Sequence, residues 1–480
     1  MISKTAYLKF EQCTKAFYLY KKHPYLKDKV ELDKQLTFNR GHQIGILAQQ
    51  LFPDGIDVSK NSKNTLETIE KTNRLILEKY PVIYEATFTF NGILVMVDVL
   101  VLIENNYYAY EVKNAVKINE VFLKDACLQY YVLKNNIPLT DFFLVTVNNN
   151  YVFNGQIDVK QLFKKRSIKQ EAEKNLNYFD VKVSQAVLTL ENNNIPNVEV
   201  GEHCFKPYFC DFYQTCWKGK VEINSIFNLP FISKKQAIEY YNAGYQKVED
   251  LPIEISLPHN ASIIKESITN KSVYIDHLKL KQFLNNINSL SCALDIEVLS
   301  TSIPDIINTK PFEQIPFLFC VYDKVSENYF YTNHNSDERK ELLNALICYT
   351  KKYKSILVYD ATMEISVINK FIEIFPNMEI ELNELKHKIV DVYDLFLNLT
   401  YYDYRFGNNF NLKAISSILL NKNFYNTINS GLQAMTLYES YRKMENLIEA
   451  EIVKQELIDY CLADTKATFE IVNFLKTLKL

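Results

Sequence analysis

The sequence predicts a multi-domain α/β protein. Two separate regions, at 81–150 and from 292 onward, contain apolar strand-like segments next to helical ones. The chain has 480 residues, of which 48% are hydrophobic, and this is enough for more than one packed core. Only 10 residues are glycine, which excludes collagen-like and glycine-rich repeat proteins.

The first half of the chain is predicted to begin with helices over residues 1–50. Strands are predicted within 81–150, at the segments YEATFTF, GILVMVDVLVLI, YYAYEVKNA and, after a helix, DFFLVTVN. A pair of charged helices is expected over 160–195, followed by a cysteine-rich loop at 203–217.

The second half begins with short helical pieces over 225–285, which are separated by prolines. A new buried strand, SCALDIEVL, then opens a block of strands that ends in a long helix. This pattern predicts three domains, at 1–222, 223–288 and 289–480.

The charges nearly balance, with 54 Lys and Arg against 57 Asp and Glu, and this excludes a globally basic nucleic-acid-binding protein but allows a local basic groove. No apolar run reaches the ~18 residues of a membrane span, and the first residues do not resemble a signal peptide. We therefore expect a cytoplasmic protein without membrane contact. Nine cysteines, an odd number, indicate metal binding or burial rather than a disulfide framework.

A first group of candidate metal-binding and catalytic residues lies on a predicted β-hairpin. If Asn105 and Asn106 form its two-residue loop, Asp98 stands opposite Lys113, and Glu111 shares their face of the sheet. Two carboxylates there are suited to Mg²⁺ or Mn²⁺, with the lysine beside an attacking water. The alternative is a solvated face with a cross-strand salt bridge.

The order Asp98, Glu111-x-Lys113 resembles the core of PD-(D/E)xK nucleases, specifically their RecB-like branch. This resemblance implies a restriction-endonuclease-like core, a further acidic ligand at Glu85 and a functional glutamine at Gln129. The branch also has a metal-ligating histidine on an early helix, and this chain has Gly45 at that position.

Cys204, Cys210 and Cys216 form a C-x5-C-x5-C pattern in an aromatic loop, where thiolates would suit Zn²⁺ or an iron–sulfur cluster. Buried free thiols are the alternative. The pattern is similar to that of iron–sulfur RecB-like nucleases, including CRISPR-associated ones. The resemblance implies that Cys13 joins the three to hold a 4Fe–4S cluster, which would link the beginning of the first domain to its end.

The middle block, around Gly244, has a helix–turn–helix pattern that vaguely resembles the helix-hairpin-helix elements of DNA-binding proteins. It lacks their G-x-G turn, so a structural linker is the favoured interpretation.

A second acidic group lies in the last block. Asp295 and Glu297, at i and i+2, share one face of an apolar strand, and Tyr460 and Asp464, at i and i+4, share one face of a helix. Glu364 lies at the start of another helix. Acids gathered in this way need cations, because burying like charges together is costly.

This order of residues resembles the DEDDy 3′→5′ exonucleases of the RNase H-like fold. The resemblance implies that Asp295, Glu297, Glu364 and Asp464 hold two metal ions and that Tyr460 positions the attacking water. Asp360, Asp391 and Asp394 are alternative acids.

As a whole, the chain resembles a bacterial family of unknown function that joins an iron–sulfur RecB-like front to such an exonuclease-like back. KPFEQIPF at 310–317 and the segments NSGLQAM and YCLADT fit this family. The implied function is a metal-dependent DNA nuclease acting on single strands or free ends, in repair, recombination or the handling of foreign DNA. Three alternatives stay open: one active site with the other as a clamp, an RNA exonuclease, and a non-catalytic nucleic-acid-binding scaffold.

Overall fold

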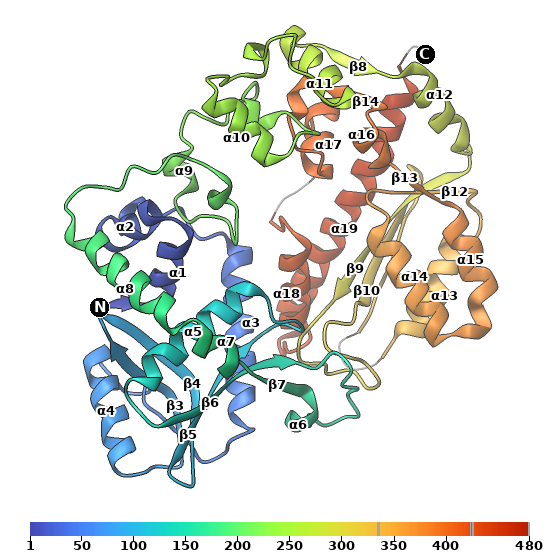
Figure 1. Cartoon of the computed structure of the whole chain (residues 1–480). Helices are drawn as coiled ribbons and strands as arrows, with labels where there is room; N and C mark the ends of the chain where they lie inside the picture. Colours follow the sequence, from blue (N-terminus) through green and yellow to red (C-terminus); the bar gives the residue numbers. More distant parts are fainter. Residues whose placement is uncertain (334–336, 423, 425–426, 479–480) are drawn as a thin grey trace. The chain divides into compact units, whose positions relative to one another are not determined.

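The structure, a computed structural model, describes residues 1–333, 337–422, 424 and 427–478. It is a mixed α/β, multi-domain protein, as expected (Figure 1). The chain divides into two compact units, which are described separately. The first unit comprises Met1–Lys218 and Thr301–Phe312, and the second comprises Gly219–Ser300 and Glu313–Leu480.

The first unit contains a mixed sheet with helices on both faces. Its elements are β1 (Ile2–Ser3), α1 (Lys4–Gln12), α2 (Thr14–Lys22), α3 (Leu32–Gln49), β2 (Ile56–Asp57), α4 (Thr65–Leu77), β3 (Val82–Phe90), β4 (Ile93–Ile103), β5 (Asn106–Lys113), α5 (Glu120–Lys134), β6 (Leu139–Val147), α6 (Val159–Leu162), β7 (Phe163–Ser167), α7 (Lys169–Lys174), α8 (Leu176–Glu191) and α9 (Tyr213–Cys216).

The strand order of this sheet is β2-β3-β4-β5-β6-β7, with β1 paired to β4. The β4 strand runs antiparallel to both β3 and β5, whereas β5 and β6 run parallel on either side of the crossover helix α5. Helices α1, α5 and α8 pack on one face around Tyr7, Tyr131 and Phe179. Helix α3 packs on the other face, where Ile44 and Ala48 lie against the strands.

The second unit contains a five-stranded sheet, a smaller two-stranded one and many helices. Its elements are α10 (Lys234–Asn242), α11 (His259–Asn270), β8 (Val273–Ile275), α12 (His277–Asn286), β9 (Ser291–Leu299), β10 (Ile315–Tyr322), β11 (Glu327–Tyr331), α13 (Arg339–Thr350), β12 (Ser355–Val358), α14 (Thr362–Ile374), α15 (Glu379–His387), β13 (Ile389–Asp391), α16 (Asp394–Leu397), β14 (Tyr401–Asp403), α17 (Leu412–Leu420), α18 (Gly431–Tyr441) and α19 (Leu447–Lys476).

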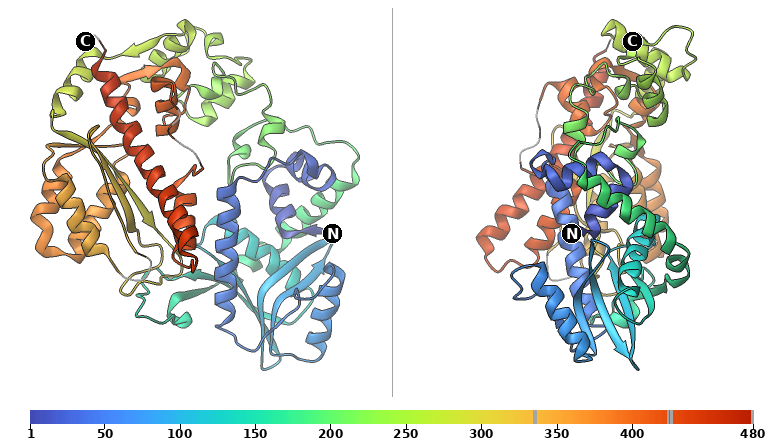
Figure 2. Two further views of the ribbon diagram at one scale, coloured as in Figure 1. Left: turned by 180° about the vertical axis from the view of Figure 1, so that it is seen from behind. Right: turned by 60° about the vertical axis from the view of Figure 1, so that its left-hand side comes forward.

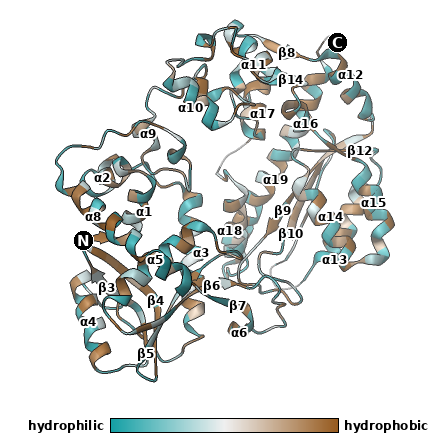
Figure 3. Ribbon diagram, viewed as in Figure 1, coloured by the Kyte–Doolittle hydropathy of each residue, from teal (hydrophilic) through white to brown (hydrophobic). Residues whose placement is uncertain are grey.

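The main sheet of this unit has the order β11-β10-β9-β12-β13, so its first strand, β9, is central. The β9 strand runs antiparallel to β10 and parallel to β12. The long helix α19 lies along β9 and β10, as the left view in Figure 2 shows. Hydrophobic residues concentrate in the central strands β4 and β9 of the two units (Figure 3).

Several local predictions need correction. The charged helix pair expected over 160–195 contains strand β7, whose sequence FKKRS forms the basic edge of the sheet. The two-residue strands β1 and β2 were missed, because segments this short carry no periodicity. The middle block does not have a core of its own: Ile226, Val248 and Ile264 share one with Val392 and Phe396.

In the described part of the chain, we find no helix with both the length and the apolar character needed to cross a membrane.

Candidate active sites and cysteine site

The first candidate site lies at a break in the pairing of β4. One edge of β4 pairs with β1 at Ile93 and Leu94 and with β5 from Val99 onward. Asp98 lies between these two stretches, and its Oδ2 accepts a hydrogen bond of 2.6 Å from the backbone N–H of Val112. A side chain thus takes the place of a strand-to-strand hydrogen bond, and the gap leaves room for functional groups.

The register of the hairpin differs from the prediction. The turn consists of Glu104 and Asn105, both with positive φ (49° and 65°), as a tight two-residue turn requires. Pairing ends at Val99 with Tyr110, so the next pair along the strands is Asp98 with Glu111. The prediction that Asp98 stands opposite Lys113 was therefore wrong. The shared face survives, because the error moves the pairing by an even step.

Glu85, on β3, extends the row of acids formed by Asp98 and Glu111 to a third strand. Its φ is 55°, and the β3–β4 pairing omits it, passing from Tyr84 with Val99 to Ala86 with Val97. Glu85, Asp98 and Glu111 therefore lie on three adjacent strands. Burial, the charge of Asp57 and the charge of Glu111 raise the pKa of Glu85 to about 7. Burial and Glu111 raise that of Asp98 to about 8.

Two lysines converge on the end of this row. Lys113 Nζ lies 2.7 Å from Glu111 Oε1 and 2.6 Å from Asp125 Oδ2. Lys4 Nζ, from the start of α1, lies 2.7 Å from the same Glu111 oxygen and 3.5 Å from Asp125 Oδ2. Burial opposes ionisation of Glu111, but the charges of Lys113 and Lys4 prevail and lower its pKa to about 2.

Several buried polar atoms of this site have no hydrogen-bond partner: Glu111 Oε2, Asp125 Oδ1 and both amide atoms of Gln129. Such atoms are costly unless a ligand satisfies them. Glu111 Oε2 is an oxygen of the kind that a hard divalent cation prefers, but the oxygens of Glu85, Asp98 and Glu111 do not all lie within 4.8 Å of one another in this structure. Gly45 has no side chain with which to bind a metal ion, although a Cβ there would meet no atom within 4 Å.

The sequence prediction missed Lys4 and Asp125. Asp125 could have been found, since it precedes Gln129 by four residues and both are buried on one face of α5. Lys4 carries no local signal, because it lies 107 residues from Glu111 in the chain.

Cys13, Cys204, Cys210 and Cys216 line one pocket, together with Trp217 and other residues of the cysteine loop. Cys13 caps helix α2, its sulfur accepting the backbone N–H of Ala16. Burial raises the pKa of the Cys210 thiol to about 12 and also raises that of Cys13 and Cys216. No three of these four sulfur atoms lie within 4.8 Å of one another.

The cysteine loop is tied to the N-terminal helices. Gln12 Nε2, at the end of α1, donates to the carbonyl oxygens of His203 and Tyr208, each at 2.7 Å. Asp211 lies 2.5 Å from Lys9 Nζ and 2.6 Å from Lys34 Nζ. Hydrogen bonds and ion pairs of the polypeptide therefore join the N-terminal helices to the cysteine loop, whether or not a cluster is bound.

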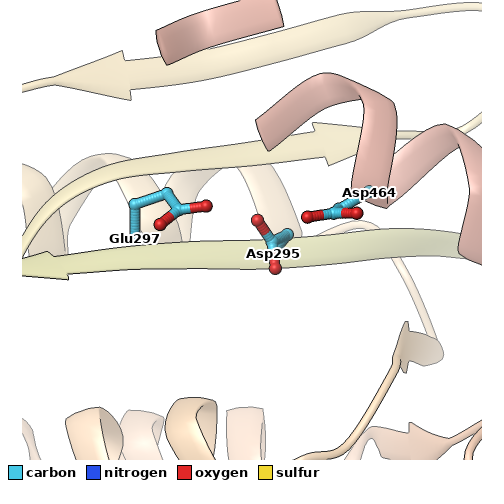
Figure 4. A group of neighbouring side chains, drawn as sticks. All are labelled: Asp295, Glu297 and Asp464. Atoms are coloured by element: carbon cyan, nitrogen blue, oxygen red, sulfur yellow. The ribbon is translucent and has the colours of Figure 1, made fainter. Parts of the chain in front are cut away.

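The second candidate site brings together acids from a strand and a helix. Asp295 and Glu297 lie on β9 and Asp464 on α19, and each offers an oxygen within 4.8 Å of the others. Figure 4 shows Asp464 pointing toward Asp295, with Glu297 on the same side of the strand. In the described part of the chain, this is the one group of three or more metal-ligating side chains that meets this distance.

Glu364, in the first turn of α14, is buried beside this group. Its Oε2 and the Oδ2 of Asp295 are both buried without a hydrogen-bond partner. Asp391 has a different role, since it accepts the backbone N–H groups of Asp360, Ala361 and Tyr393 at 2.9–3.0 Å. It thereby holds the turn that precedes α14.

Tyr460 lies one turn before Asp464 on α19, as the i, i+4 spacing predicts. The ammonium of Lys413 stands 5.1 Å from the centre of its ring and donates to the carbonyl oxygen of Asn429 at 2.6 Å. Lys413 is a second cation that the sequence prediction missed. Its charge acts against the raised pKa of Glu297.

Burial and mutual repulsion dominate the electrostatics of this site. Burial, followed by the charge of Asp464, raises the pKa of Asp295 to about 8. Burial and the charge of Asp295 also raise the pKa of Glu297 and of Glu364 well above their usual range. These acids, two of which (Asp295 and Glu364) have an unsatisfied buried oxygen, fit divalent cations, which would neutralise them.

Mn²⁺ is expected to stabilise the second unit more at pH 8 than at pH 5.5. The raised pKa of Asp295 makes the metal-free unit less stable as pH rises from about 4 to about 8, because the unfolded chain releases its proton first. Mn²⁺ at 100 times its Kd should then raise the melting temperature by about 5–10 °C at pH 8. Differential scanning calorimetry measures this shift.

The control for this experiment is Asp459→Asn, which alters an exposed acid of the same helix and should keep the full shift. Asp295→Asn should abolish it. An equal shift in wild type and Asp295→Asn would show that Mn²⁺ binds elsewhere.

Part of the second unit matches a known protein family. Residues 292–410 are similar to a family described as a domain of unknown function (DUF2779). This range contains Asp295, Glu297 and Glu364 but ends before Asp464. No curated protein matches the chain.

Proposed function

We propose that this chain is a metal-dependent DNA nuclease with two active sites. One is a RecB-like PD-(D/E)xK site in the first unit, and the other is a DEDDy-type 3′→5′ exonuclease site of the RNase H-like fold in the second. The observation that carries the proposal is the group Asp295, Glu297 and Asp464, whose ligand oxygens approach within 4.8 Å. Carboxylates this close, with a buried unsatisfied oxygen on Asp295, support cation binding.

In the second site, Asp295, Glu297, Asp464 and Glu364 would hold Mg²⁺ or Mn²⁺. Two such ions about 4 Å apart would supply positive charge to both the attacking and the leaving oxygen of a phosphodiester. Tyr460 would orient the attacking water through its hydroxyl group. Its ring is held beneath Lys413, which limits the positions that the hydroxyl can take.

In the first site, Asp98 and Glu111 would hold the cation, with Glu85 as a further acidic ligand. Lys113 would act on the attacking water, since its ammonium already lies within hydrogen-bond distance of Glu111. Gln129 would donate to a ligand or substrate atom, which its unsatisfied amide supports. This site is the weaker of the two, because position 45 supplies no histidine.

The four cysteines would hold a 4Fe–4S cluster. A single tetrahedral zinc ion, with Zn–S bonds of about 2.3 Å, would need four sulfurs roughly 3.8 Å apart. No three of the sulfurs are within 4.8 Å, so they do not form the compact set that a single zinc ion needs, and what supports the cluster is the resemblance of the cysteine spacing.

Protein purified without oxygen is therefore expected to be brown and to contain about four irons per chain. Cys204→Ala should lose the iron and make the first unit sensitive to proteolysis, because ligand loss frees the loop. Cys348→Ala, at an exposed cysteine, is the matched control and should keep the iron. One tightly bound zinc and no iron would refute the cluster.

Cleavage assays on 3′-labelled single-stranded DNA, duplex DNA and RNA test the function. Wild type, a first-site variant (Lys113→Ala), a second-site variant (Asp464→Asn) and the double variant should be compared. Activity lost in only one single variant would indicate one active site with the other as a clamp, and preference for RNA would indicate an RNA exonuclease. Binding without cleavage in Mg²⁺ and Mn²⁺ would indicate a scaffold and overturn the proposal.

A further inference from the structure

The first site contains a second lysine that the RecB-like pattern does not include. Lys4 follows strand β1 directly, and β1 is fixed to β4 by the pairing of Ile2 with Ile93. The backbone N–H of Ile2 also donates to the carbonyl oxygen of Gly92 at 2.8 Å. The first residues of the chain are thus bound to the strand that carries Asp98.

The other end of helix α1 is equally constrained. Gln12 and Lys9 bind the cysteine loop through the contacts described above, and Tyr7 Oη donates to Glu11 Oε1 at 2.7 Å. Lys124, from α5, lies 2.8 Å from the second oxygen of Glu11. Because α1 is held along its length, the ammonium of Lys4 has a defined position.

The two oxygens of Glu111 have different surroundings. Oε1 accepts from both Lys4 and Lys113, each at 2.7 Å, whereas Oε2 is buried without a partner. The side chain of Lys4 is 25% exposed and that of Glu111 3%, so most of this contact is shielded from water. Hydrogen bonds to charged groups in such places are stronger than those between neutral groups.

We propose that Lys4 is a positioning residue of the first site, which holds Glu111 by Oε1 so that Oε2 stays available as a metal ligand. This inference rests on the proposed function of that site. Lys113 makes the same contact, but it lies closer to Asp125 than Lys4 does, at 2.6 Å against 3.5 Å, and its proposed role is toward the attacking water. Lys4 therefore keeps the carboxylate in place while Lys113 serves the reaction.

The test measures Mn²⁺ binding by isothermal titration calorimetry in full-length protein carrying Asp295→Asn and Asp464→Asn, which disable the second site. Lys4→Met should weaken Mn²⁺ binding about tenfold, the effect of losing one charged hydrogen bond. Lys4→Arg should restore it to within about threefold, since arginine keeps the charge and the donors. Removing a nearby positive charge would by itself strengthen cation binding, so tighter binding overturns the proposal.

Lys124→Met is the matched control, because it breaks another ion pair that holds α1, the one between Lys124 and Glu11, without touching Glu111. Equal losses in Lys4→Met and Lys124→Met would mean that only the packing of α1 matters, and this result would overturn the positioning role. If Lys4→Met does not fold, Lys4→Gln replaces it under the same criteria. Failure of the proposed function can be told apart from failure of the Lys4 proposal. If the first site binds no metal at all, Asp98→Asn will also leave Mn²⁺ binding unchanged.

Discussion

Asp464→Asn is expected to lower the 3′→5′ exonuclease rate by about 10³-fold or more, because a metal ligand of a two-ion site contributes several kcal/mol to the transition state. The side chain keeps its size and loses only its charge. The measurement is the release of mononucleotides from 3′-labelled DNA in Mn²⁺, in a Lys113→Ala background that removes cleavage by the first site. Tyr460→Phe should cost less, about tenfold, since only one hydrogen bond is lost.

The matched control is Asp459→Asn, an exposed acid five residues earlier on α19, which should leave the rate unchanged. A rate for Asp464→Asn within threefold of this control would remove the second site from the proposal. If Tyr460→Phe instead lowered the rate as much as Asp464→Asn does, the Tyr460 hydroxyl would do more in the reaction than orient the water.

The second large effect is expected for Lys113→Ala, measured in an Asp464→Asn background. Cleavage by the first site should fall at least about 10²-fold, as is typical when a group that acts on the nucleophile is removed. Mn²⁺ binding should persist, because Lys4 still holds Glu111 Oε1. Endonuclease and exonuclease assays on linear and circular DNA, with calorimetry for the metal, separate these two properties.

Lys117→Ala serves as its control, since this exposed lysine follows Lys113 by four residues without contacting the acids. Undiminished cleavage in the Lys113 variant would mean that the first site is not catalytic, and the one-site alternative would then hold. If the variant lost Mn²⁺ binding as well as cleavage, Lys113 would instead be needed to maintain the metal-binding site.

Much of the second site could be predicted from sequence because its geometry is local. Asp295 and Glu297 share a face by strand alternation, and Tyr460 and Asp464 share one by helical spacing. Only the meeting of β9 with α19 depends on the tertiary fold. The first site was less predictable, since its strands do not alternate regularly: Val95 and Val97 pack into the same core as Leu100, so β4 changes face at Asp98.

Long-range partners were beyond the reach of local patterns. Lys4 reaches Glu111 through a two-residue strand, and Lys413 reaches Tyr460 from α17. Neither position differs in sequence from an ordinary surface lysine. The turn at Glu104 and Asn105 was misplaced by one residue because three consecutive polar residues were available and only backbone geometry selects two of them.

The path of the chain also restricts how this protein can be divided. Thr301–Phe312, directly after the strand that carries Asp295 and Glu297, belongs to the first unit, where Phe153 exchanges backbone hydrogen bonds with Asn308 and Thr309. The polypeptide therefore passes between the units three times, and no single cut yields both of them complete. A gene truncated after the cysteine loop would encode a first unit without this strip. A single recombination breakpoint therefore cannot exchange either unit intact, and the two candidate activities would be inherited together.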